Sequence, residues 1–481
     1  MPTFACIINH YIIVMKRLTY LMLFLLVALV AKAQQAKYVF YFIGDGMGLN
    51  QVNTTEMYLG EQQGRIGTEP LCFASFPVAG MATTFSASNS ITDSAAGGTA
   101  LATGVKTYNG AIGVDANKER VMSVAERAKR AGKKVGVTTS VSVDHATPAA
   151  FYGHQPDRSM YYEIALQLPE AGFDFYAGSG FLKPARTFDK KDAPSIYPII
   201  EQAGYTIARG IDEYQAKAGD ADKMVLIQKD GTDASSLPYA IDRNEGDLTL
   251  AQITESAIDF LSRDNKKGFF LMVEGGKIDW ACHSNDPATM VKEVIDMDNA
   301  VRVAYEFYKK HPKETLIVIT ADHETGGLGL GNSNYTLNLK SLDCQKQSVD
   351  LLSRALTDLR KAKGNKATWE DVKALLTERM GFWGELTPTW EQEKMLRDEF
   401  ESSFVRNKIV FEESLYSKTE PLAAVAKKVL SQMSKLGWTT GSHSAEYVPV
   451  FAVGAGSKLF MGKMDNTDIP KRIAKAAGYK W

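Results

Sequence analysis

The feature that most constrains the fold is a series of short, mostly apolar runs separated by long polar or helical stretches. The runs cover residues 38–43, 134–139, 269–273, 316–320 and 448–453. Runs of this length are typical of strands that are buried on both faces of a parallel sheet. Because helical segments lie between them, the pattern favours a doubly wound α/β fold. The sequence therefore predicts a mostly parallel central sheet flanked by helices.

Other segments are assigned by weaker signals. Residues 173–176 and 224–227 are strand-like, whereas 50–82 are interpreted as a helix and a linker, and 448–453 as the last strand. The region 332–437 is charged, has apolar residues at helical spacing and shows little strand character. We expect it to form a helical insertion in the catalytic domain.

The N-terminus has the pattern of a targeting sequence. A basic start at 15–17 is followed by the apolar run 18–30 and an A-x-A site that ends at Ala33. This pattern predicts a secretory signal peptide over 1–33, with an upstream extension before Met15, and a catalytic domain over 34–481. The mature protein is then expected to be periplasmic or extracellular, without a stable membrane anchor. An uncleaved anchor is the alternative.

Charge and cysteine content exclude two further classes. The chain has 55 Lys and Arg against 56 Asp and Glu, so there is no electrostatic case for a nucleic-acid partner. Removal of the leader would leave Cys72, Cys282 and Cys344, which form at most one pair and no disulfide framework.

Polar side chains follow several of the apolar runs. Asp45, Glu274 and the pair Asp322-His323 come directly after three of them, and the loop 144–147 follows a fourth. Ligands bind at the carboxyl ends of strands in open α/β sheets, so these side chains are expected to meet in one crevice.

Further ligand types have the spacing of a metal site. Asp279 and His283 lie four residues apart and share one face of a helix. Imidazole with carboxylate suits zinc, and carboxylate with hydroxyl suits magnesium. Two neighbouring ions are a common device for displacement at phosphorus, and Arg158 is suited to bind two phosphate oxygens.

The stretch 92–104 supplies a candidate nucleophile. Ser94 stands behind Asp93 and is followed by very small residues that allow a close approach of the backbone. A helix beginning at Ser94 would favour an anion there, and the hydroxyl would need a base or a metal for activation. The alternative is a helix of small residues packed on the sheet, with Asp93 or Ser94 as its N-cap.

The motifs together resemble those of the alkaline phosphatases, from about Tyr38 to Val453. They are Gly44 to Gly48, Thr92 to Ala96, Asp144 to Thr147, Val273 to His283, Thr320 to His323 and Gly441 to His443. The resemblance implies an exported phosphomonoesterase that acts on small phosphate monoesters with two zinc ions and one magnesium ion. It leaves open whether the protein is a homodimer, because the insertion is unlike the family's crown region.

The resemblance also implies a role for each matching residue. Ser94 resembles the serine that becomes phosphoserine, and Arg158 resembles the phosphate clamp, with Asp93 beside it. The ligands of the first zinc ion, which stabilises the leaving group and then activates water, correspond to Asp279, His283 and His443. Those of the second, which holds the serine alkoxide, correspond to Asp45, Asp322 and His323. The magnesium ligands correspond to Asp45, Thr147 and Glu274. His145 and Trp280 stand at neighbouring positions that vary within the family.

Two alternatives remain at this stage. A phosphodiesterase or sulfatase of the same superfamily would lack the combination of Arg158, Thr147, Glu274 and this serine motif. A non-catalytic phosphate- or metal-binding protein would have lost the nucleophile or a zinc ligand. Turnover of a chromogenic phosphomonoester, with and without a chelator, distinguishes them.

Overall fold

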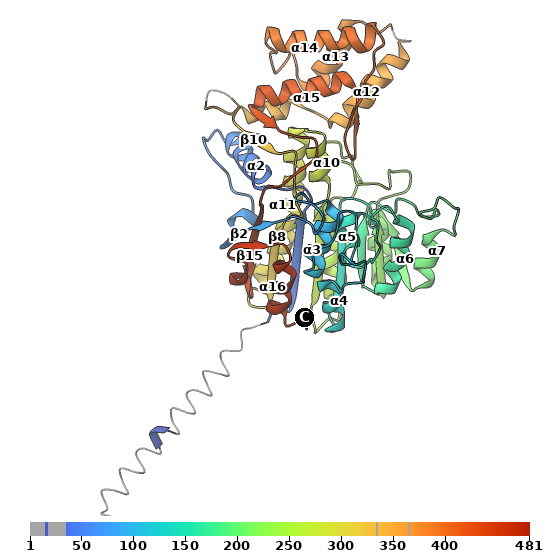
Figure 1. Ribbon diagram of the computed structural model, residues 1–481, viewed down its shortest axis with the longest axis vertical. Coiled ribbons are helices and arrows are strands. Elements are labelled where there is room, and N and C mark those ends of the chain that lie inside the picture. The colour runs from blue at the N-terminus through green and yellow to red at the C-terminus, as the bar shows by residue number, and fades with distance from the viewer. Residues whose placement is uncertain (1–14, 18–34, 333–334, 364–365) are drawn as a thin grey trace, which may run out of the picture.

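A ten-stranded sheet forms the centre of the fold (Figure 1), in the order β16-β2-β15-β8-β1-β7-β3-β4-β6-β5. The computed structural model describes residues 15–17, 35–332, 335–363 and 366–481. The strands of this sheet are β1 (Tyr38–Gly44), β2 (Val78–Thr83), β3 (Lys134–Thr139), β4 (Phe175–Gly178), β5 (Tyr205–Arg209), β6 (Lys223–Ile227), β7 (Phe269–Gly275), β8 (Thr315–Thr320), β15 (Val448–Gly454) and β16 (Gly462–Asp465). Every neighbouring pair is parallel except the two that β15 makes with β2 and β8. The prediction of a mostly parallel sheet is confirmed.

Helices cover both faces of this sheet, as a doubly wound fold requires. Those before the insertion are α2 (Leu49–Gln62), α3 (Ser94–Thr103), α4 (Val124–Arg130), α5 (Ala146–Ala149), α6 (Tyr161–Ala171), α7 (Ile196–Gln202), α8 (Gly210–Lys217), α9 (Leu250–Ser262), α10 (Lys277–His283) and α11 (Pro287–Lys310). One layer contains α9 and α11, which pack on each other and on the central strands. The opposite layer contains α3, α4, α5 and the C-terminal α16 (Asp468–Ala477).

The register of the central strands places the ends of three strands side by side. Ile43 of β1 pairs with Glu274 of β7 on one side and with Thr320 of β8 on the other. All seven residues of β1 are buried, because helices cover both of its faces. The loops after β1 and β8, which carry Asp45 and Asp322, therefore emerge at the carboxyl ends of the strands. Glu274, the last residue but one of β7, lies at the same level.

Three strands of the ten-stranded sheet were not predicted, and each lacks a run of large apolar residues. β2 lies within 50–82, β5 lies between the two strand-like runs of the middle region, and β16 follows the segment interpreted as the last strand. β2 and β16 contain small or polar residues and alternate between buried and exposed positions. Since both lie near one edge of the sheet, their outer positions meet water rather than a second helix layer.

The region 332–437 contains α12 (Val349–Ala362), α13 (Trp369–Met380), α14 (Trp390–Phe400) and α15 (Pro421–Ser434). In Figure 1 these helices pack together at the top, beyond the sheet and next to α10. None of its described residues joins the ten-stranded sheet. The small strands here are β11 (Glu412–Glu413) and β12 (Lys418–Thr419), which pair as a hairpin, and β13 (Leu436–Trp438), which pairs with β10 (Leu328–Leu330). The expected helical insertion is present.

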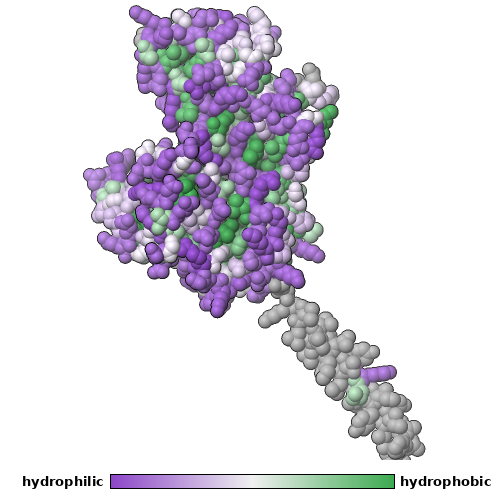
Figure 2. Space-filling model, turned by 180° about the vertical axis from the view of Figure 1, so that it is seen from behind, coloured by the Kyte–Doolittle hydropathy of each residue, from purple (hydrophilic) through white to green (hydrophobic). Residues whose placement is uncertain are grey.

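The surface is mostly hydrophilic on the face that Figure 2 shows, with apolar residues in small groups. Within the described part of the chain, no helix is long and apolar enough to cross a bilayer. The predicted signal peptide lies outside the described residues, apart from residues 15–17.

A buried aspartate joins the sheet domain to the insertion. Asp286, which is the N-cap of α11, accepts hydrogen bonds from Thr289 N and Oγ1, from Gln345 Nε2 at 2.9 Å and from Val349 N at 2.8 Å. Because Gln345 and Val349 belong to the insertion, one carboxylate fixes its first helix to the segment that follows α10.

We therefore expect Asp286→Ala to lower the free energy of unfolding by about 2–4 kcal/mol, since it leaves several buried donors without an acceptor. The matched control is Thr389→Ala, which removes the N-cap of α14 and should cost only about 1 kcal/mol. Urea unfolding in one zinc and magnesium buffer measures both. Equal midpoints for the two variants would contradict the assigned role of Asp286.

Candidate active site

Ser94 is the first residue of α3, and the helix is built to approach the sheet closely. Asp93 caps the helix by accepting from Ala96 N at 3.0 Å, and every residue of α3 is buried. A Cβ on Gly97 would lie 3.0 Å from the Asp322 carbonyl oxygen, and one on Gly98 would lie 3.1 Å from Thr147 Cα. The small residues therefore bring the N-terminus of α3 against the loops after β8 and β3. Ser94 Oγ lies 3.2 Å from His323 Nε2.

Three imidazoles are held so that their Nε2 atoms face one space. His283 Nδ1 lies 2.7 Å from the Gly441 carbonyl, His443 Nδ1 2.8 Å from the Thr92 carbonyl and His323 Nδ1 3.2 Å from Thr325 Oγ1. A hydrogen bond from Nδ1–H to an oxygen leaves Nε2 with a free lone pair, which is the usual arrangement of metal-binding histidines. The Nε2 atoms of His283 and His443 are only 3.1 Å apart.

Four carboxylates share the same crevice and repel one another. Burial, followed by the charges of Asp322, Asp279 and Glu274, raises the pKa of Asp45 well above its usual value. Burial likewise raises the pKa of Asp322, and it raises that of Glu274 to about 7. Burial lowers the pKa of His323 and of His443, so both imidazoles are neutral. A neutral imidazole next to a carboxylate is a combination that binds a cation.

The unpartnered atoms fit cations. Both oxygens of Asp45, Oε1 of Glu274 and Oδ2 of Asp279 are buried without a hydrogen bond in the described structure. Buried carboxylate oxygens are expected to have partners, and divalent cations would satisfy these. The donor atoms form three overlapping groups, with all atoms of a group within 4.8 Å of one another. The groups are Asp279, His323 and His443; Asp45, Asp322 and His323; and Asp45, His145 and Glu274.

Arg158 lies at the rim of this cluster. Its Nη1 donates to Asp93 Oδ2 at 3.1 Å, and its Nη2 donates to the Tyr416 hydroxyl at 2.6 Å. Asp93 also accepts from Gly110 N, so the carboxylate that orients the guanidinium is itself fixed. The Tyr416 ring stacks on Trp280, with centroids 4.7 Å apart and planes at 12°.

The residues singled out in the sequence lie together in this crevice. Thr147 Oγ1 is 3.4 Å from Asp322 Oδ2, and His283 Nε2 is 3.4 Å from Asp279 Oδ2. The structure places His145 closer to the centre than the sequence suggested, because it shares a candidate metal group with Asp45 and Glu274. Sequence reasoning missed Thr325 and Tyr416. Thr325 adjoins a recognised motif, whereas nothing in the local sequence distinguishes Tyr416.

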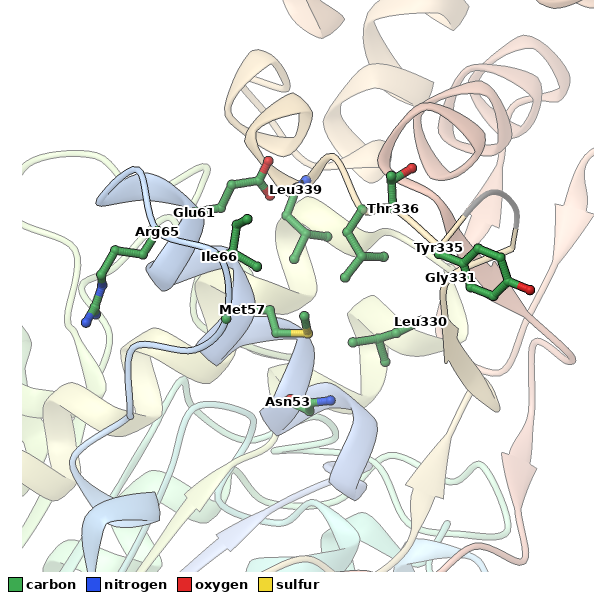
Figure 3. Close-up of a pocket in the computed structure, with 12 residues that line it drawn as sticks. Asn53, Met57, Glu61, Arg65, Ile66, Leu330, Gly331, Tyr335, Thr336 and Leu339 are labelled. Atoms are coloured by element: carbon green, nitrogen blue, oxygen red, sulfur yellow. Dashed lines mark hydrogen bonds between the residues drawn. The ribbon is translucent and has the colours of Figure 1, made fainter.

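A separate cavity of about 790 Å³ lies elsewhere, between α2 and the segment that includes β10 (Figure 3). Met57, Ile66, Leu330 and Leu339 give it a largely apolar lining, and none of the candidate site residues borders it. Cavity size therefore does not identify the chemistry in this protein.

The fold and the site together define an α/β enzyme whose crevice combines a hydroxyl, a guanidinium and cation-binding side chains, as phosphoryl transfer requires. The sequence profile of the family described as Alkaline phosphatase matches residues 36–175 and 231–479. The chain belongs to the alkaline phosphatase family, and it is a phosphoric monoester hydrolase. Alkaline phosphatase 3 of Bacillus subtilis is 33% identical over 456 residues, which cover 92% of this chain and 90% of that protein.

Solved structures agree with this assignment. The cold-active alkaline phosphatase of Shewanella sp. has a TM-score of 0.76 at 30% identity, covering 92% of this chain and 99% of that one. The Thermus thermophilus alkaline phosphatase has a TM-score of 0.74 at 25% identity, covering 93% and 92%. A variant of TAB5 alkaline phosphatase with magnesium bound in its M3 site has a TM-score of 0.66 at 28% identity, covering 94% and 100%.

The crowded carboxylates predict that chelation lowers stability. Cations that bind only the folded state stabilise it by about 4 kcal/mol at a thousand-fold excess over Kd. Thermal unfolding of the mature chain after EDTA and dialysis should therefore show a lower Tm, which added zinc and magnesium restore. An identical Tm with and without the metals would contradict the binding of cations in the crevice.

The raised pKa values also predict how the metal-free protein responds to pH. The folded state keeps protons on Glu274 and Asp45 that the unfolded chain releases, so the free energy of unfolding falls as pH rises through the folded pKa values. The neutral histidines act in the opposite sense, but only below roughly 6.5, the pKa of an unperturbed histidine. The Tm of the chelated protein should therefore fall as pH rises toward and through about 7, the folded pKa of Glu274. The fall should be clearest between about pH 6.5 and about pH 7.5, where the histidines no longer oppose the change.

Proposed function

We propose that the protein hydrolyses phosphate monoesters through a phosphoserine on Ser94, with two zinc ions and one magnesium ion in the crevice. The observation that carries this proposal is the position of the Ser94 hydroxyl. It stands at the N-terminus of a buried helix, 3.2 Å from His323 Nε2, beside carboxylates whose oxygens lack partners. A buried hydroxyl in that setting is suited to nucleophilic attack on phosphorus.

The donor groups support the assignment of the ions, since one group is Asp45, Asp322 and His323 and another contains Asp45 and Glu274. The third group joins Asp279 and His443 with His323, and His283 Nε2 lies 3.1 Å from His443 Nε2. Asp279, His283 and His443 would hold the first zinc ion, and Asp45, Asp322 and His323 the second. Asp45, Thr147 and Glu274 would hold magnesium, with His145 as a further donor at that place. Bound there, the ions supply charge neutralisation and lower the pKa of coordinated hydroxyl groups and water.

The side chains of this chain then bind and orient the reactants. Arg158 binds two oxygens of the phosphoryl group, and Asp93 keeps the guanidinium aimed at the helix N-terminus. The Ser94 hydroxyl loses its proton as Oγ forms a bond to phosphorus, and the bond from phosphorus to the ester oxygen breaks on the opposite side. The ester oxygen takes up a proton and leaves as the alcohol. Water then attacks the phosphoserine, which releases inorganic phosphate and restores the serine.

We also propose that the chain is exported through the leader at 1–33 and works in the periplasm or outside the cell. The basic start and the A-x-A site support this proposal. N-terminal sequencing of the secreted protein should begin at Gln34.

Ser94→Ala should lower turnover of 4-nitrophenyl phosphate by several orders of magnitude, because the covalent route is lost. The matched control is Ser434→Ala, which removes another buried hydroxyl in the insertion and should leave turnover unchanged. Trapping of phosphoenzyme at low pH with labelled substrate gives a direct reading. Near-normal turnover by a folded Ser94→Ala protein would contradict the proposal.

Arg158→Ala should raise KM and weaken inhibition by inorganic phosphate more than it lowers kcat. A charge-assisted hydrogen bond contributes roughly 1.5–3 kcal/mol, whereas the cations provide most of the charge stabilisation. Steady-state kinetics with inorganic phosphate as inhibitor measures both constants. Unchanged inhibition would mean that Arg158 does not bind phosphate.

A further inference from the structure

The helical insertion contributes a side chain to the active site. Tyr416 lies in the β11–β12 hairpin, and its hydroxyl accepts a hydrogen bond from Arg158 Nη2 at 2.6 Å. Its ring also contacts His283 edge-on at 5.4 Å and His145 at 5.6 Å between ring centroids. One residue of the insertion thus reaches the guanidinium, a histidine of the proposed first zinc set, the histidine beside the proposed magnesium set and, through its stacking, Trp280.

The hairpin is fixed beside the metal cluster rather than laid loosely over it. Ser284, which directly follows His283, donates from its hydroxyl to Ser417 Oγ at 2.9 Å. Lys427 of α15 donates to the Ser284 carbonyl at 2.8 Å and forms an ion pair with Glu412. Tyr416 is therefore held between the end of α10 and the insertion.

The guanidinium has two supports. Asp93, the N-cap of α3, holds Nη1, and Tyr416 of the insertion holds Nη2. An arginine side chain has many rotamers, and fixing it before the ligand arrives reduces the entropy lost on binding. Nη2 also lies 3.5 Å from His145 Nε2, and the five N–H groups of the guanidinium still leave donors for phosphate oxygens.

We propose that Tyr416 is a positioning residue for Arg158: its hydroxyl and Asp93 together hold the guanidinium in the orientation that binds the phosphoryl group. The insertion thereby takes part in phosphate binding. This inference rests on the proposed role of Arg158 as the phosphate clamp. Burial raises the pKa of Tyr416 above its usual value, so the hydroxyl stays neutral under working conditions.

The test separates the hydroxyl from the ring. Tyr416→Phe keeps the stacking on Trp280 and removes only the contact with Arg158. We expect KM for 4-nitrophenyl phosphate and Ki for inorganic phosphate to rise together by roughly ten-fold, as for loss of a hydrogen bond to a charged group, without a fall in kcat. The matched control is Tyr205→Phe, which removes a hydroxyl bonded to the Phe173 carbonyl at the far edge of the sheet and should change neither constant.

A double-mutant cycle distinguishes positioning from a general structural role. In the Arg158→Ala background, Tyr416→Phe should cause no further change in Ki, because the group that it positions is gone. Additive effects, or an unchanged or lower Ki in the single Tyr416→Phe variant, would overturn the inference. If Arg158→Ala alone left Ki unchanged, the proposed clamp itself would fail. A raised Ki for Arg158→Ala with none for Tyr416→Phe would refute only the role of Tyr416.

Discussion

The active site depends on the parallel register that ends β1, β7 and β8 at one level. Pairing of Ile43 with both Glu274 and Thr320 places three carboxylate-bearing segments next to one another. Their charges repel in a buried crevice, as the raised pKa values of Asp45, Glu274 and Asp322 express. The backbone hydrogen bonds of the sheet hold these groups together against that repulsion, and cations are the natural complement. The register of the sheet therefore creates the donor cluster that could hold cations.

Approach of the nucleophile depends on a second constraint, which is the absence of side-chain bulk on α3. Gly97 and Gly98 lie against the backbone of the loops that carry Asp322 and Thr147. A larger residue at either position would push the helix, and Ser94 with it, away from the cluster. The stretch of small residues thus serves tight packing and chemistry at once, so the two readings of that stretch in the sequence are compatible.

Much of this arrangement could be predicted from the sequence, because strands buried in a parallel sheet form continuous apolar runs. The residues that follow the carboxyl ends of such strands are where ligands bind. Asp45, Glu274 and Asp322 follow from that rule alone. The edge strand β16 and its neighbour β2 escaped it, since both are partly exposed and consist mostly of small or polar residues rather than large apolar ones. Tyr416 could not be found this way, because its place depends on how the insertion folds back onto α10, and no periodicity encodes that contact. His145 was assigned to the surroundings of the site, whereas its distance to Asp45 and Glu274 becomes visible only in three dimensions.

The antiparallel direction of β15 determines where along the chain the last donor of the crevice lies. Because β15 runs against its neighbours, its beginning rather than its end meets the crevice, and His443 comes just before it. The candidate donors of this crevice therefore range along the chain from Asp45, just after the first strand, to His443, just before β15. A cation held by Asp279 and His443 would close a loop between distant parts of the chain, as a long-range cross-link would. His443 is the last of these donors along the chain, so the donor cluster is complete only when the segment just before β15 is in place.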